Sequence, residues 1–195
     1  MPKEIEIKFR IDNLPALTRA LKKAGFKQLT PSTHEMNSLY DLLGQKLRRR
    51  GELLRLRKYG KNWTLTHKAK GNAGRHKTER HKVRVELETR VENGQQTDAI
   101  LQALGFAPTF RYEKYRAEWT DGKGHVVLDE TPIGNFGEIE GPPRWIESTA
   151  CALGIAPTDY VTQTYADLFF DWKRATRSRA GEMTFRAIGK NSKKR

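Results

Sequence analysis

The chain has 195 residues, of which 36% are hydrophobic and 31% charged. This length fits one domain with a substantial core, and a single cysteine, Cys151, excludes a disulfide framework. No apolar run reaches the roughly 20 residues that a membrane-spanning helix needs, and the acidic N-terminal stretch lacks the features of a signal peptide. We therefore expect a cytoplasmic protein that does not enter a membrane.

The formal net charge of +14 is unevenly distributed along the chain. Residues 173–195 hold nine lysines and arginines against one acidic residue, a net charge of +8 that leaves +6 for residues 1–172. We predict a folded domain over 1–172 and a basic, flexible C-terminal tail over 173–195. A run of charge attracts polyanions without specificity, so we expect no specific nucleic-acid partner.

Hydrophobic periodicity and capping residues predict about eight strands and four helices. In chain order these are a strand over 3–11, a helix over 13–23, strands over 36–42, 53–59, 63–70 and 82–90, a helix over 97–104, strands over 111–119, 124–130 and 136–140, and helices over 142–154 and 158–173. Apolar residues at helical spacing in the last helix predict a core stripe. Glycine-containing turns at 60–62 and 121–124 predict two hairpins, so the fold class is α+β, and eight antiparallel strands can close into a barrel.

Each predicted strand has one charged face. The first reads "KEIEIKFRI", in which Glu4, Glu6, Lys8 and Arg10 alternate with apolar residues. The corresponding faces of the later strands carry Arg55 and Arg57; Thr64, Thr66, Lys68 and Lys70; Lys82, Arg84, Glu86, Glu88 and Arg90; Lys114, Arg116 and Glu118; Asp129, in phase with Val127; and Glu138 and Glu140.

A single charged face of this kind is typical of a sheet with one solvated side. Three pairs, however, place carboxylates two residues apart on one face, which is unfavourable unless cations lie between them: Glu4/Glu6, Glu86/Glu88 and Glu138/Glu140. If these faces line the inside of a barrel, the carboxylates select Mg²⁺ or Mn²⁺ and the arginines and lysines select phosphate. A ligand that satisfies both is a metal-bound polyphosphate.

These motifs resemble, in order, those of the CYTH superfamily, the triphosphate tunnel metalloenzymes. The matching elements are "EIEIK", "LRLR", "LTHK", "RVELE", "EKYR", "LDETPIGNFGEIEG" and "TYADLF". ExExK alone is weak evidence, whereas six further ordered elements with matching strand phase are specific. The resemblance covers roughly residues 3–170.

The resemblance implies an eight-stranded antiparallel closed barrel whose charged tunnel binds a triphosphate with Mg²⁺ or Mn²⁺, two ions per site, and it suggests a homodimer. The implied metal ligands are Glu4, Glu6, Glu86, Glu88, Asp129, Glu138 and Glu140. The implied phosphate-binding residues are Lys8, Arg55, Arg57, Lys68, Arg84, Lys114 and Arg116, and the implied catalytic residues are Glu4, Glu6, Lys8 and Arg57. Some family members also use a lysine on the last helix. Residues 161–165 contain none, so either this role is absent or another residue, such as Lys173, fills it.

No Ser-His-Asp or Cys-His set is visible in the sequence, and phosphoryl transfer requires mainly positioning and charge neutralisation. We expect one metal ion to orient the triphosphate and a second to activate water. The favoured function is therefore hydrolysis of inorganic, nucleoside or thiamine triphosphate. The alternative is a class IV adenylate cyclase, which converts ATP to cyclic AMP and pyrophosphate, and a third is a module that binds polyphosphate or RNA through its tail.

Overall fold

The computed structural model describes residues 3–70 and 82–192. Within these residues, the side chains of 3–4, 70, 82–84 and 190–192 are not described. The elements are β1 (Lys3–Ile11), α1 (Leu14–Lys23), β2 (Lys27–Leu42), α2 (Lys46–Arg50), β3 (Leu53–Tyr59), β4 (Asn62–Lys70), β5 (Lys82–Val91), α3 (Gly94–Ala103), β6 (Phe106–Thr120), β7 (His125–Thr131), β8 (Gly134–Glu140), α4 (Pro143–Ala152), the 3₁₀ helix η1 (Pro157–Asp159), α5 (Tyr165–Thr176) and α6 (Phe185–Ser192).

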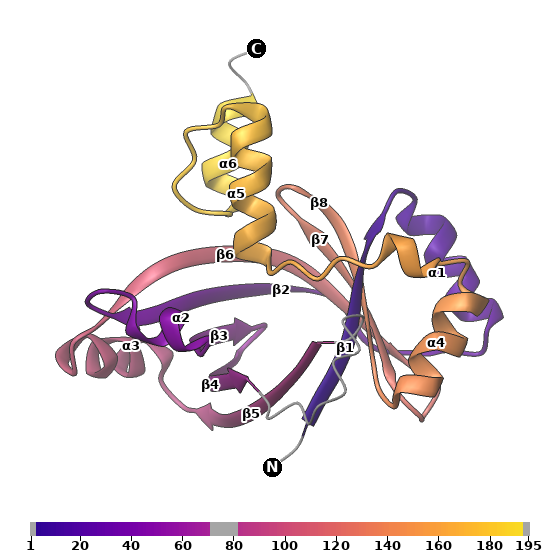
Figure 1. Ribbon diagram of the computed structural model, residues 1–195, viewed down its shortest axis with the longest axis horizontal. Helices are drawn as coiled ribbons and strands as arrows, with labels where there is room; N and C mark the ends of the chain where they lie inside the picture. Colours follow the sequence, from indigo (N-terminus) through magenta and orange to yellow (C-terminus); the bar gives the residue numbers. More distant parts are fainter. Residues whose placement is uncertain (1–2, 71–81, 193–195) are drawn as a thin grey trace.

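The eight strands form one antiparallel sheet in the order β1-β5-β4-β3-β2-β6-β7-β8, which is the order of a closed barrel. The order returns to its start because β1 pairs with β5 through residues 3–6 and with β8 through residues 6–11. The predicted α+β class with eight antiparallel strands is confirmed. In Figure 1 the long β2 and β6 curve side by side across the molecule.

The predicted strands are all present, but β2 and β6 begin earlier than the sequence indicates. Strand β2 begins at Lys27 rather than 36, and β6 begins at Phe106 rather than 111. The two strands pair along this added length, with register shifts between Gln28 and Thr30 and between Thr30 and Thr33. Such irregularities break the alternation of apolar and polar residues, and this hid the extra length.

Local capping explains where the helices differ from prediction. Helix α1 begins after Asn13, whose side chain accepts a hydrogen bond from Ala16 N at 3.0 Å, as predicted. Helix α3 begins three residues before the predicted 97 because Asn93 caps it through Gln96 N. Helix α4 lies within the predicted range, and the short α2 and α6 were not predicted.

The last predicted helix begins later than the sequence indicates. Residues 157–159 form the separate 3₁₀ turn η1, and α5 starts only after Thr164. Thr164 and Asp167 form a reciprocal capping box that fixes this start. Between the two helices, Val161 N donates to Lys8 O at 2.7 Å on β1. The backbone therefore crosses β1 where a continuous helix was expected.

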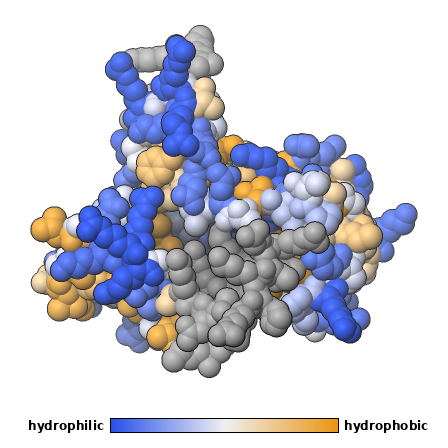
Figure 2. Space-filling model, in the orientation of Figure 1, coloured by the Kyte–Doolittle hydropathy of each residue, from blue (hydrophilic) through white to orange (hydrophobic). Residues whose placement is uncertain are grey.

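The predicted flexible tail is corrected over residues 173–192. Residues 173–176 complete α5, and Ala180, Met183 and Ile188 are buried against the aromatic residues of β6 and α5. Met183 N donates to Arg111 O and Met183 O accepts from Glu113 N, both at 3.0 Å. This edge of β6 is open because β7 pairs with β6 only from Tyr115 onward. Figure 2 shows hydrophilic residues over most of the visible surface of the projecting α5–α6 pair, which is why its sequence reads as a tail.

Three apolar clusters hold the helices on the sheet. Helices α1 and α4 cover the outer faces of β1 and β6–β8, where Phe9 packs over Gly137 so closely that a Cβ there would lie 2.2 Å from the ring. Helix α3 packs Leu101 against Tyr40 and Leu56 of β2 and β3. The third cluster joins α5 and α6 to β6 and β8, and Figure 1 shows this pair rising from the sheet. Among the described helices, none is long and apolar enough to cross a membrane.

Met183→Ala tests whether the C-terminal segment is part of the core. Met183 is fully buried, so its truncation should lower the free energy of unfolding by about 2–5 kcal/mol. Chemical denaturation of the variant measures this loss, with the exposed Arg179→Ala as the control that should change little. Equal stability of the two variants would show that residues 177–192 are a detachable tail.

Candidate active site

Charged residues of opposite sign face each other across neighbouring strands on one side of the sheet. Lys8 pairs in register with Glu138, Arg116 with Asp129, and Lys68 with Glu86. Directly opposed residues on one face are near enough for their side chains to interact. The alternation predicted from the sequence therefore brings the two signs of charge together.

Asp129 is the centre of a first group of buried charges. Its side chain is fully buried. Lys114 Nζ donates to its Oδ2 at 2.9 Å, and Arg116 forms a double contact, Nε to Oδ1 at 2.7 Å and Nη2 to Oδ2 at 2.6 Å. The hydroxyl of Tyr165, on α5, also donates to Oδ2 at 2.6 Å. Both carboxylate oxygens are thus occupied by protein donors.

Glu138 extends this group to β1. Its Oε2 accepts from Arg116 Nη2 at 2.5 Å, and its Oε1 lies 3.0 Å from Lys8 Nζ. The Lys8 ammonium also lies over the Tyr165 ring, 4.3 Å from its centroid. We call these residues the Asp129 cluster: Lys8, Lys114, Arg116, Asp129, Glu138 and Tyr165.

The charges of the Asp129 cluster stabilise one another against the penalty of burial. Burial raises the pKa of Glu138, but Lys8 and Arg116 outweigh this effect and hold the pKa well below its usual value. Burial lowers the pKa of Arg116, and Asp129 and Glu138 raise it further than burial lowers it. Burial and the neighbouring Asp129 together raise the pKa of Tyr165 well above its usual value. Tyr165 therefore remains a neutral hydrogen-bond donor.

A second group of charges lies on β3, β4 and β5. Arg57 donates from Nε to Thr64 Oγ1 and from Nη2 to Glu88 Oε1, both at 3.2 Å. Thr66 donates to Glu88 Oε2 at 2.6 Å, and Arg55 lies 3.7 Å from the same oxygen. Lys68 and Glu86 form a separate pair at 3.0 Å. We call these residues the Glu88 cluster: Arg55, Arg57, Thr64, Thr66, Lys68, Glu86 and Glu88.

Glu35 and Asn37 on β2 belong to the same site but were missed in the sequence. Both are fully buried. Glu35 Oε1 lies 3.4 Å from Lys114 Nζ and accepts from Asn37 Nδ2 at 2.8 Å. The predicted strand began at 36, one residue after Glu35. In "THEMN", the polar residues Thr33, Glu35 and Asn37 fall at every second position. Extending the predicted strand back over them would have placed Glu35 on the charged face.

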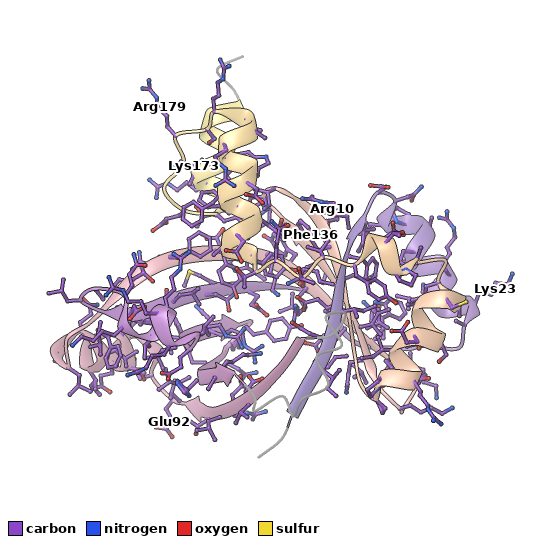
Figure 3. All side chains as sticks on the ribbon, in the orientation of Figure 1. Arg10, Lys23, Glu92, Phe136, Lys173 and Arg179 are labelled. Carbon is purple, nitrogen blue, oxygen red and sulfur yellow. The ribbon has the colours of Figure 1, made fainter. Side chains whose placement is uncertain are left out.

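Tyr165 is the first residue of α5, and it reaches the Asp129 cluster. It was predicted as core and is buried, yet its hydroxyl binds Asp129. Lys173 lies farther along α5 (Figure 3) and lines an outer groove with Phe170 and Arg177. Arg10, which lies outside the family motif, packs over the Phe136 ring at 4.9 Å (Figure 3).

Comparison with known proteins identifies the family. The model of the CYTH domain matches residues 2–144. The chain belongs to the CYTH domain family. A Methanocaldococcus jannaschii protein named "putative adenylate cyclase" is 28% identical over 176 residues, covering 85% of this chain and 97% of that protein.

Solved structures share the fold of this CYTH domain. A "putative adenylate cyclase" from Vibrio parahaemolyticus has a TM-score of 0.72 at 19% identity, covering 86% of this chain and 97% of that one. A Hippeastrum "putative adenylyl cyclase", described as having a dominant triphosphatase activity, has a TM-score of 0.60 at 20% identity, covering 86% of this chain and 95% of that one. At these identities the likeness establishes the fold alone.

The remaining predicted site residues of the CYTH domain lie on β1, β5 and β8. Glu6 is opposite Glu140 and two residues from Lys8 on the same face. Glu4 and Arg84 are opposite each other in the backbone register, but their side chains lie outside the described residues. Among the described side chains, no three acidic, histidine or cysteine groups are gathered as a metal site, because lysines and arginines lie between the carboxylates.

Asp129→Asn tests whether the charges of the Asp129 cluster depend on one another for stability. The substitution leaves Lys114 and Arg116 with less negative charge in a buried site, which should lower the free energy of unfolding by about 3 kcal/mol. The exposed neighbour variant Glu130→Gln should be nearly neutral. If denaturation finds the two variants equally stable, the Asp129 cluster does not hold this part of the sheet together.

Glu35 should make stability depend on acid pH. Burial raises its pKa, but Lys114, Arg116, Arg55 and Arg57 together lower it from 4.5 to about 2. The folded state therefore gains stability above the unfolded pKa and loses it as pH falls from 4.5 towards 2, by about 3 kcal/mol in all. Denaturation at pH 7, 4 and 3 should show a smaller loss for Glu35→Gln than for the wild type. If the free energy of unfolding falls equally with pH in the two proteins, this prediction is wrong.

Proposed function

We propose that this protein is a metal-dependent triphosphatase that binds a triphosphate inside the ring of strands and hydrolyses it. One observation carries the proposal: six cations from four strands face the same side of the sheet as the paired carboxylates. Three belong to the Asp129 cluster and three to the Glu88 cluster: Lys8, Lys114, Arg116, Arg55, Arg57 and Lys68. A triphosphate carries enough negative charge to engage several of them at once.

Burial makes these cations suitable for holding phosphate. Lys8 and Lys114 are 5% and 2% exposed. The pKa of Lys8 is lowered by burial and raised more by Glu138 and Glu6, so the ammonium remains charged. Fixed charges in a site of low dielectric stabilise transferring phosphoryl groups strongly, since they need no reorganisation. Arg57 would bind phosphate oxygens through its guanidinium group, Arg116 would add the N–H donors that Asp129 and Glu138 leave unused, and the lysines would act as point charges.

The carboxylates fit Mg²⁺ or Mn²⁺ by the chemistry of their oxygens. Glu6 and Glu140 are directly opposed on β1 and β8, and Glu138 is two residues away on the same face. Glu4, Glu6 and Glu140 would hold the metal, whereas Glu138 would orient Arg116 and Lys8, which already occupy its two oxygens. Bound there, the ion would neutralise charge on the phosphate oxygens and polarise the phosphoryl group. Asp129, predicted as a ligand, would instead orient Lys114 and Arg116, since both its oxygens already accept from them.

The second candidate function is adenylate cyclase, as in the name of the Methanocaldococcus jannaschii relative. In that reaction the ribose 3′-hydroxyl of ATP attacks the α-phosphorus and pyrophosphate leaves. The same cations and metal ligands serve both reactions. Hydrolysis remains the favoured function because it requires only the charged site described above, whereas cyclisation also requires a nucleoside pocket.

Product analysis distinguishes the two functions. The protein should be incubated with Mg²⁺ or Mn²⁺ and inorganic triphosphate, thiamine triphosphate or ATP, and phosphate, pyrophosphate and cyclic AMP should be resolved. We expect phosphate release that requires the metal. Arg57→Ala should lower kcat/KM by about 10–100-fold, because a charge-assisted contact to phosphate is worth about 1.5–3 kcal/mol.

Two controls accompany this assay. Arg179→Ala removes an exposed arginine outside the site and should retain wild-type activity. Glu4→Gln removes a proposed metal ligand and should raise the metal concentration that half-maximal activity requires. Formation of cyclic AMP with pyrophosphate would select the cyclase, and no product from any triphosphate would overturn the enzyme proposal.

A further inference from the structure

Three buried polar atoms in the site have no hydrogen-bond partner among the residues that the structure describes. They are Glu35 Oε2 and Asn37 Oδ1 on β2 and Arg55 Nε on the neighbouring β3. Buried polar groups are nearly always hydrogen-bonded, because an unpaired one costs about 1–3 kcal/mol. Three such atoms on adjacent strands, on the face that carries the charged clusters, indicate a position for a small polar ligand.

The orientation of the two oxygens follows from the contacts around them. Glu35 Oε1 is used twice, by Asn37 Nδ2 at 2.8 Å and by Lys114 Nζ at 3.4 Å. A carboxylate only accepts hydrogen bonds, so the Asn37 amide must present its NH₂ group to Glu35 and its Oδ1 elsewhere. What remains is a pair of acceptors, Glu35 Oε2 and Asn37 Oδ1, two residues apart on one strand face. Their ligand must therefore be a hydrogen-bond donor.

The surrounding charges limit what that donor can be. Lys114 and Arg116 approach from β6, and Arg55 and Arg57 from β3; the charges of all four lower the pKa of Glu35. Four cations disfavour a divalent metal at this point, and the carboxylate disfavours direct contact with an anion. Water is neutral and has two O–H donors for the two acceptors. The same four cations are the proposed phosphate contacts, so this water would lie beside the phosphoryl group.

We propose that Glu35 and Asn37 hold the water that attacks the terminal phosphoryl group, an inference that rests on the triphosphatase function proposed above. With its two O–H groups directed at Glu35 Oε2 and Asn37 Oδ1, the water directs a lone pair at phosphorus. Its oxygen bonds to phosphorus as the bond to the bridging oxygen breaks, and that oxygen leaves on pyrophosphate with the electron pair. As the new bond forms, one water proton passes to an oxygen of the transferring phosphoryl group, which is released as inorganic phosphate, and Glu35 stays ionised throughout. Arg55 Nε donates to the transferring group.

A crystal structure of the wild-type protein without substrate tests the position directly. At a resolution that shows ordered solvent, one water should lie within about 3.2 Å of both Glu35 Oε2 and Asn37 Oδ1. Crystals soaked in Mn²⁺ provide the control, since an anomalous signal at this point would identify a metal site instead. Either that signal or the absence of any water would overturn the proposal.

Kinetics tests whether this water reacts. Asn37→Leu keeps the size of the side chain but removes the acceptor, so kcat for inorganic triphosphate should fall about 100-fold. The dissociation constant of the non-hydrolysable imidotriphosphate should stay within about twofold. Glu35→Gln should lower kcat at least 10-fold, and Glu92→Gln, an exposed carboxylate away from the site (Figure 3), is the matched control.

The outcomes separate this inference from the proposed function. If the wild type releases phosphate and both variants keep its kcat, the inference fails and the triphosphatase function stands. A change in the dissociation constant without a change in kcat would likewise overturn it, because that result indicates a role confined to holding Lys114. A wild-type protein that releases no phosphate overturns both. Thermal unfolding of each variant confirms that it is folded, and if Asn37→Leu is unfolded, Glu35→Gln decides.

Discussion

The contact of Arg116 with Asp129 and Glu138 is the interaction on which the rest of the site depends. It joins β6, β7 and β8 through one guanidinium group whose donors reach two carboxylates at 2.5–2.7 Å. Each of these charges would be too costly to bury alone. Because they are buried together, Lys8 and Lys114 can also be held in the interior in ionised form. The Asp129 cluster is therefore one electrostatic unit rather than a set of separate pairs.

Helix α5 is coupled to this unit through Tyr165. The helix starts at a capping box one residue earlier, and its first residue donates to Asp129 while its ring contacts Lys8. The apolar residues of the same helix pack with Met183 and Ile188 of the C-terminal segment. The position of a site hydroxyl is thus determined by a core that extends to residue 188. This explains how a segment that reads as a tail can influence the chemistry of the site.

The sequence predicted the strands correctly where apolar and polar residues alternate without interruption. Strands β1, β3 and β5 begin at the predicted residues, and the opposed faces of Leu54/Leu56 and Arg55/Arg57 follow directly from alternation. It failed at β2, where register shifts interrupt the pattern before Thr33. Glu35 lies in the regular part that follows, but the predicted strand began one residue after it. It also failed at α5, because a helical stripe of apolar residues gives no sign that one hydroxyl meets a buried carboxylate.

The sequence by itself determined the family, the α+β class and which residue types share a strand face, because these depend on local order and periodicity. Only the tertiary structure decided which charges meet. Tertiary contacts placed Asp129 among Lys114, Arg116 and Tyr165, although Lys114 and Tyr165 are 51 positions apart in the chain. It also left two buried oxygens on β2 without a donor in the described part of the chain. Such contacts depend on the register between strands and on the end of β7, where an open edge of β6 receives the C-terminal segment.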